Sequence, residues 1–257
     1  MSIETGLIVL LCAFGGALAG MLIRATLPAH HFSQEAKDSI NIAAATVSVL
    51  AALVITSLLT SARSAFDTTR ANIQEFSANL VLLDRVMAHY GQETNEARDL
   101  LRRYTALKIE LTWPKERTRK PVMDDPAALE LLETLQDKLR ALAPESEAQH
   151  WLKSRALQVS GDLAQVRWKL AIHNISVIPH PFLMVVVFWL AILFVSFGLF
   201  APCNPMVITA LFVSALSVAA GIGLILELER PLEGVIRVSA EPMQSALAHL
   251  RAHLSGN

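Results

Sequence analysis

The fold of this chain is decided by the stretch LAIHNISVIPHPFLMVVVFWLAILFVSFGLFAPCNPMVITALFVSALSVAAGIGLIL, which runs from Leu170 to Leu226 without an Asp, Glu, Lys or Arg. One membrane crossing needs roughly 20 apolar residues, so the stretch is long enough for two. The Pro-Cys-Asn-Pro sequence from Pro202 to Pro205 divides it, because proline and asparagine favour a turn. We therefore predict two membrane-spanning helices, at about 180–201 and 205–227, joined by a tight turn.

Two further charge-free runs lie near the start of the chain, at about 5–23 and 39–62. Each is long enough to cross a bilayer once. No Lys or Arg precedes the first run, so we do not expect it to be a cleaved signal peptide. Within that run, Gly16 and Gly20 are spaced for close packing against another helix. The sequence thus predicts four spans and an integral membrane protein, with the lipid bilayer as its surroundings.

The composition restricts the function. The chain is 53% hydrophobic and only 18% charged, and its mean hydropathy is +0.43. A net charge of -1 without a clustered basic face argues against a nucleic-acid partner. The sequence contains no Gly-rich phosphate loop, nucleophile elbow or zinc motif, so we expect no enzyme, no catalytic residues, no metal site and no cofactor.

Basic residues near the ends of the predicted spans indicate the orientation. With four spans, both termini and the segment between the second and third spans share one side of the membrane. The opposite side has only Arg24 and Lys37. The shared side has Arg63, Arg70, Arg167, Lys169, Arg230 and Arg237. We expect the termini and the central segment to be cytoplasmic.

The central segment, 63–169, is predicted to be a cytoplasmic helical domain. Its first apolar stripe recurs at helical spacing and consists of Phe66, Ile73, Phe76, Leu80, Leu83, Met87 and Tyr90. No breaker separates this stripe from the second span, so one long helix is expected from Ser39 to Tyr90. Gly91 should end that helix.

Three more helices are expected before the third span. One covers about 95–111, and another begins at Asp125-Pro126, which has the residues of an N-cap and first helical turn. The last covers about 145–175, with Trp151, Leu163 and Val166 facing the core. Strand patterns are lacking, so the predicted fold class is all-α. The predicted domains are 1–62 (first pair of spans), 63–169 (helical domain), 170–229 (second pair of spans) and 230–257 (cytoplasmic tail).

The second span carries a weakly polar stripe at steps of three and four, formed by Asn41, Ala45, Ser48, Ala52, Thr56 and Thr60. Such a face can line a water-filled pore, which makes Asn41, Ser48, Thr56 and Thr60 candidate pore-lining residues. Small and hydroxyl residues also let helices approach closely in lipid. Both interpretations stay open at this point.

The candidate cytoplasmic mouth of such a pore is formed by Glu227, Glu229 and Arg230, at the end of the fourth span. Repeated around the axis of a symmetric ring, the acidic residues would attract cations. The simpler interpretation is an interfacial ion pair between one of these acids and a nearby arginine.

Several short motifs resemble those of a bacterial family of bestrophin-like membrane proteins, over about residues 6–250. The motifs are Leu83-Asp84-Arg85, Tyr90-Gly91, Ala97-Arg98, Trp113-Pro114, the run from Phe197 to Pro202, and the run from Glu229 to Gly234. The sequence departs from the usual pattern at Glu229, where Asp is commoner, and at Leu232, where Phe is commoner. The resemblance implies an inner-membrane protein with the layout of bestrophins, which are pentameric anion channels. The second span has no counterpart of their aromatic constriction, so no pore residue is carried over.

Two hypotheses follow. The first is a homo-oligomeric ion channel with a cytoplasmic helical domain. The second is a non-conducting membrane scaffold or sensor whose cytoplasmic bundle binds a protein partner.

Overall fold

The computed structural model describes residues 2–26, 34–114, 121–122, 124–172 and 180–252. Over these ranges the chain forms helices and contains no strand, which confirms the all-α fold class. It divides into two compact units. We call residues 1–65 with 176–229 the apolar unit, and residues 66–175 with 230–257 the bundle unit.

The apolar unit contains α1 (Ser2–Thr26), the first part of α2 (Gln34–Tyr90), α6 (His180–Phe200) and α7 (Pro205–Leu228). Each of these four helices is long and apolar enough to cross a membrane, as the sequence predicted. The turn between α6 and α7 also forms as expected. The side chain of Asn204 accepts a hydrogen bond from the Met206 backbone N–H at 3.0 Å, and Pro205 occupies the first helical position.

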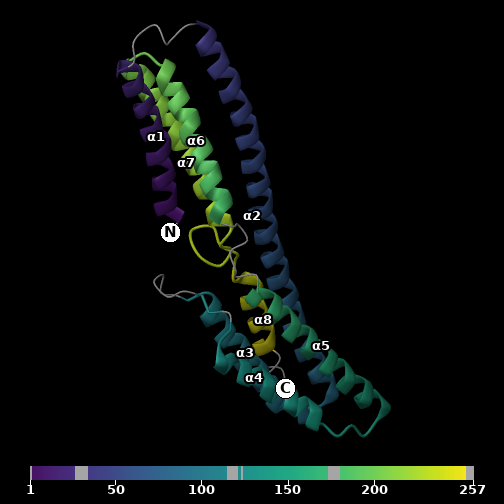
Figure 1. Cartoon of the computed structure of the whole chain (residues 1–257). Coiled ribbons are helices and arrows are strands. Elements are labelled where there is room, and N and C mark those ends of the chain that lie inside the picture. Colours follow the sequence, from purple (N-terminus) through teal and green to yellow (C-terminus); the bar gives the residue numbers. More distant parts are fainter. Residues whose placement is uncertain (1, 27–33, 115–120, 123, 173–179, 253–257) are drawn as a thin grey trace. The chain divides into compact units, whose positions relative to one another are not determined.

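Within the apolar unit, α1 packs against α6 and α7 (Figure 1). A Cβ atom added at Gly20 would collide with the backbone of Val195 and Leu199, and one at Gly198 with the backbone of Ala17. These glycines therefore let the two backbones touch, which confirms close packing at the Gly16–Gly20 motif. At the end of α1, Arg24 donates a hydrogen bond to the Ala201 carbonyl at 2.6 Å.

The bundle unit contains the rest of α2, a short 3-10 turn (Gln92–Thr94), α3 (Asn95–Thr112), α4 (Pro126–Ala141), α5 (Glu147–Ile172) and α8 (Glu241–Ala252). Its core joins the apolar stripes of these helices. The long α2 helix ends at Tyr90 as predicted, and Gly91 has a φ of 136° that favours glycine. Asp125 caps α4 by accepting from the Ala127 and Ala128 N–H groups.

One core assignment was wrong. Trp151 was expected in the core, but its side chain is 65% exposed. The buried face of α5 passes through Ala156, Leu163 and Leu170. Trp151 lies 12 positions before Leu163, which turns it about 120° away from that face at roughly 100° per residue.

Candidate functional site

The first part of α2 is the least covered helix of the apolar unit. Only 6% of its most apolar window is buried, against 33% for α1, 28% for α6 and 22% for α7. Its packed side is formed by residues such as Ala51, Ile55 and Leu58, which face the other helices of the unit. The remaining circumference of the helix is not covered by the described residues of this unit.

The predicted weakly polar stripe lies on this uncovered part of α2. Asn41, Thr56 and Thr60 are exposed, and Ser48 is half-buried at the border of the packed side. The structure therefore places the candidate pore-lining residues on one face. Apart from the partial burial of Ser48, none of them is covered by the helices that the structure describes.

The hydroxyl groups of the stripe donate their protons back into the helix. Ser48 donates to the Ala44 carbonyl at 2.8 Å, Thr56 to Ala52 at 2.8 Å and Thr60 to Thr56 at 2.9 Å. A hydroxyl that donates its only proton in this way presents oxygen lone pairs to its surroundings. The face thus offers hydrogen-bond acceptors.

Large apolar side chains lie on the same uncovered surface. Ile42 is 70% exposed, Val49 61% and Leu53 63%. Val49 and Leu53 precede Thr56 and Thr60 by seven residues, so they share a face of α2 with them at roughly 100° per residue. The uncovered surface of α2 therefore combines hydroxyl groups with apolar side chains.

The candidate mouth residues lie where the chain passes from one unit to the other. Glu227 and Glu229 belong to the end of the apolar unit, and Arg230 begins the bundle unit. All three are half-buried. Arg230 forms an ion pair with Glu233 at 3.8 Å, an acid that the sequence interpretation had not considered.

Most of the motifs that carry the family resemblance stabilise the bundle unit, while the run from Phe197 to Pro202 belongs to the apolar unit. Arg98 donates two hydrogen bonds to Asp84, from Nε at 2.8 Å and from Nη2 at 3.2 Å, and both side chains are buried. The Trp113 indole donates to the Val238 carbonyl at 2.9 Å. In the run that follows α7, the Val238 N–H donates to the Pro231 carbonyl at 2.7 Å, and Leu232 is buried in the core. These residues stabilise turns and contacts between helices.

A buried polar cluster in the bundle unit was missed from the sequence. Tyr104, Lys108 and Thr112 follow one another at steps of four on α3, and all are buried. Arg167 of α5 is buried as well and pairs with Asp124 at 2.5 Å. The sequence did contain a signal for this cluster. Tyr104, Lys108 and Thr112 follow the apolar Leu101 at helical spacing, so they lie on the same face of α3. Arg167 was instead counted among the basic residues that flank the membrane.

Four helices able to cross a bilayer, together with a helical bundle, define an integral membrane protein of the multi-span helical class. Residues 11–243 match the Bestrophin-like domain, so the chain belongs to the bestrophin-like family.

The fold is similar to the crystal structure of a point-mutated bacterial bestrophin homologue from Klebsiella pneumoniae. The TM-score is 0.63 over 98% of each chain, with 12% sequence identity. No curated protein matches the chain in sequence.

Proposed function

We propose that this protein is a homo-oligomeric ion channel of the bacterial inner membrane, with α2 lining the pore. The observation that carries the proposal is the weakly polar face of α2, left uncovered by a unit whose other helices pack together. The bestrophin-like family and the similarity of fold to a bacterial bestrophin homologue support it.

A ring of identical chains explains why this face is uncovered. In a single chain the stripe from Asn41 to Thr60 would lie against lipid, which offers no hydrogen bonds. Four spans from one chain are too few to enclose a wide pore. Copies arranged around an axis would turn the stripe of each α2 toward shared water.

The chemistry of the stripe favours cations. Its hydroxyl protons are already donated to helix carbonyls, so the oxygens facing the pore act as acceptors. Glu227 and Glu229, repeated around the ring, would add negative charge at one mouth.

The proposed orientation places both termini and the bundle unit in the cytoplasm. Arg63, Arg70 and Arg237 support it. Arg167 no longer contributes to this argument, because it is buried and paired with Asp124. A reporter fused to the C-terminus, active only in the cytoplasm, tests the orientation.

The direct test of conduction is ion flux through purified full-length protein in liposomes, with a cysteine at Thr56 as the reporter. The native cysteines, Cys12 and Cys203, are exposed and are first replaced by Ala and Ser. In the Thr56→Cys protein, a charged thiol reagent is expected to reduce flux strongly. In the matched control Phe188→Cys, whose site is 62% exposed on α6, the reagent should have no effect. Absence of flux under every salt gradient would contradict the proposal.

The scaffold function remains a second candidate because of the outer face of α5. Its exposed positions recur at steps of three and four and include two tryptophans: Glu147, Trp151, Ser154, Gln158, Gly161, Gln165, Trp168 and Ile172. Lys169 is exposed beside Trp168. Exposed tryptophans are typical of protein interfaces. If liposomes show no flux while Trp151→Ser and Trp168→Ser abolish a stoichiometric complex with a purified cytoplasmic protein, the scaffold function replaces the channel.

A further inference from the structure

The segment that follows α7 forms a closed loop in the bundle unit. The Val238 N–H donates to the Pro231 carbonyl at 2.7 Å, and the Glu233 N–H donates to the Arg230 carbonyl at 3.1 Å. Pro231, Leu232 and Val238 are buried. We call residues 231–238 the post-span loop. Its two ends are bonded to each other and packed into the unit.

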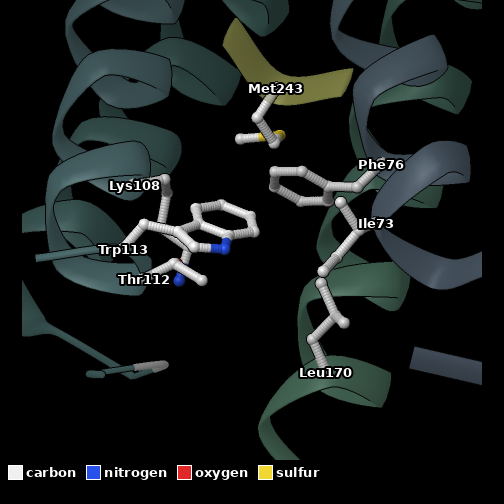
Figure 2. Close-up of a pocket in the computed structure, with 7 residues that line it drawn as sticks. All are labelled: Ile73, Phe76, Lys108, Thr112, Trp113, Leu170 and Met243. Carbon is white, nitrogen blue, oxygen red and sulfur yellow. The ribbon is translucent and has the colours of Figure 1, made fainter. Parts of the chain in front are cut away.

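The base of the post-span loop is also held by a tryptophan of the bundle core. The Trp113 indole donates to the Val238 carbonyl at 2.9 Å. Figure 2 shows the Trp113 ring directed toward Phe76 and Met243, at a cavity of about 260 Å³ including the space open to solvent. The loop is therefore attached to packed helices, and its tip stands on a fixed base.

The tip of the post-span loop exposes apolar side chains. Val235 is 88% exposed and Ile236 37%. Among the large apolar side chains that the structure describes, Val235 has the greatest exposed fraction. Gly234 has a φ of 83°, which favours glycine and turns the chain just before this pair. Two adjacent aliphatic residues held out in this way would gain free energy from an apolar environment.

The place of the post-span loop in the chain indicates which apolar environment is near. Only two residues separate its first residue, Pro231, from Leu228, the last residue of α7. Three steps of chain span at most about 11 Å. The interfacial layer of a bilayer extends roughly 5–8 Å beyond the hydrocarbon on each side. Because α7 is long and apolar enough to cross the membrane, this layer is within reach of the loop whatever the arrangement of the two units.

The charges of the post-span loop suit lipid headgroups. Glu233 is its one acidic residue and forms an ion pair with Arg230 at 3.8 Å. Arg237 is exposed and directly follows Ile236. The tip thus carries a positive charge beside two aliphatic side chains. Such a combination fits the membrane interface, where a guanidinium binds phosphate while apolar groups enter the acyl boundary.

We propose that the tip of the post-span loop, formed by Val235, Ile236 and Arg237, inserts into the interfacial layer of the membrane beside the end of α7. A second copy of the chain or a protein partner would also cover two aliphatic side chains. Lipid is favoured over both because the loop directly follows a span and has a cationic tip. The contact does not depend on conduction, since the proposed pore stripe on α2 takes no part in it.

The test measures how strongly lipid quenches a fluorescent label on the tip. Full-length protein with Cys12→Ala, Cys203→Ser and Val235→Cys is labelled and reconstituted in phosphatidylglycerol–phosphatidylcholine vesicles. A lipid with a nitroxide near the top of its acyl chain should remove most of the fluorescence at position 235. The matched control is Leu82→Cys, another exposed apolar site. It lies about 30 Å along the unbroken α2 helix from Ala62, where the charge-free run ends, so its label should keep its fluorescence.

Three results would overturn the proposal. Equal quenching at positions 235 and 82 would mean that the dye itself, and not the loop, enters the lipid. Quenching at position 235 by aqueous iodide but not by the nitroxide lipid would place the tip in water. Protection from both quenchers would mean that a second copy or a protein partner covers it.

If the labelled variant does not insert into vesicles, photolabelling of the unaltered protein by a lipid that carries a diazirine decides. Covalent label on residues 234–237 as well as on α7 supports the contact. Label on α7 without label on these residues overturns it.

Discussion

Arg98 holds Asp84 by two hydrogen bonds, of 2.8 and 3.2 Å, between the start of α3 and the last turns of α2. Both side chains are nearly excluded from solvent, with 10% and 4% exposure. Nearby, the Thr94 hydroxyl lies 2.6 Å from the Met87 carbonyl and 2.8 Å from that of Gly91. The pair therefore stabilises the turn between α2 and α3 inside the bundle unit.

The Asp84→Ala substitution is expected to destabilise the bundle unit by about 3–5 kcal/mol, because it leaves the Arg98 guanidinium buried without its counter-charge. Urea unfolding of the full-length protein, followed by circular dichroism, measures the change. The control is Asp137→Ala, which breaks an exposed pair with Arg140 and should cost less than about 1 kcal/mol. Equal losses of unfolding free energy in the two variants would show that the buried pair stabilises the protein no more than the exposed pair does.

The Gly198→Ala substitution should weaken the contact between α1 and α6. The added methyl would collide with the backbone of Ala17, which cannot move aside as a side chain could. We expect a loss of about 1–3 kcal/mol, seen as a lower Tm in detergent. Gly15→Ala is the control, since a methyl there meets nothing within 4 Å. Its Tm should stay the same or rise, because alanine favours a helix.

The Lys108→Met substitution should remove a pH-dependent contribution of Lys108 to the stability of the folded protein. The folded-state pKa of Lys108 is about 8, below its usual 10.5. Below pH 8 the folded protein therefore holds a buried ammonium group, and the resulting penalty is fully present. As the pH rises from 8 to 10.5, the folded state loses this proton before the unfolded state does, and the penalty disappears.

The difference in unfolding free energy between the Lys108→Met protein and the unaltered one should therefore fall between about pH 8 and pH 10.5 and level off above that range. Urea titrations at a series of pH values measure it. A difference that does not change with pH would mean that the lysine is not buried as a cation.

The Trp113→Phe substitution should make the segment between α7 and α8 more mobile, because it removes a hydrogen bond to that segment. Phenylalanine keeps much of the apolar volume but cannot donate to the Val238 carbonyl, which now accepts the indole N–H at 2.9 Å. Losing a hydrogen bond of this kind costs about 1 kcal/mol. Hydrogen exchange should speed up at Val238, whose own N–H is bonded to Pro231, while exchange in α4 stays unchanged. Unchanged exchange at Val238 would show that the indole does not anchor the segment.

Much of the fold could be predicted from residues close together in the sequence. The end of α2 at Gly91, the cap at Asp125 and the turn at Asn204 each depend on the chemistry of a few neighbouring residues. The polar stripe on α2 was visible for the same reason, because helical spacing alone places Asn41 and Thr56 on one side. Spacing could not tell whether neighbouring helices cover that side. In the structure α6 and α7 contact another side of α2, formed by residues such as Ile55 and Leu58.

The sequence by itself determined that this protein has four apolar helices able to cross a membrane, since their length and lack of charge suffice for that property. It also determined the α-helical class of the remaining chain. The tertiary structure decided which polar groups lie inside. Lys108 and Arg167 read as surface residues, and Trp151 as a core residue, until the helices are packed. The rotation of each helix about its axis is set by contacts with distant segments, so burial of a single side chain cannot be read from local sequence.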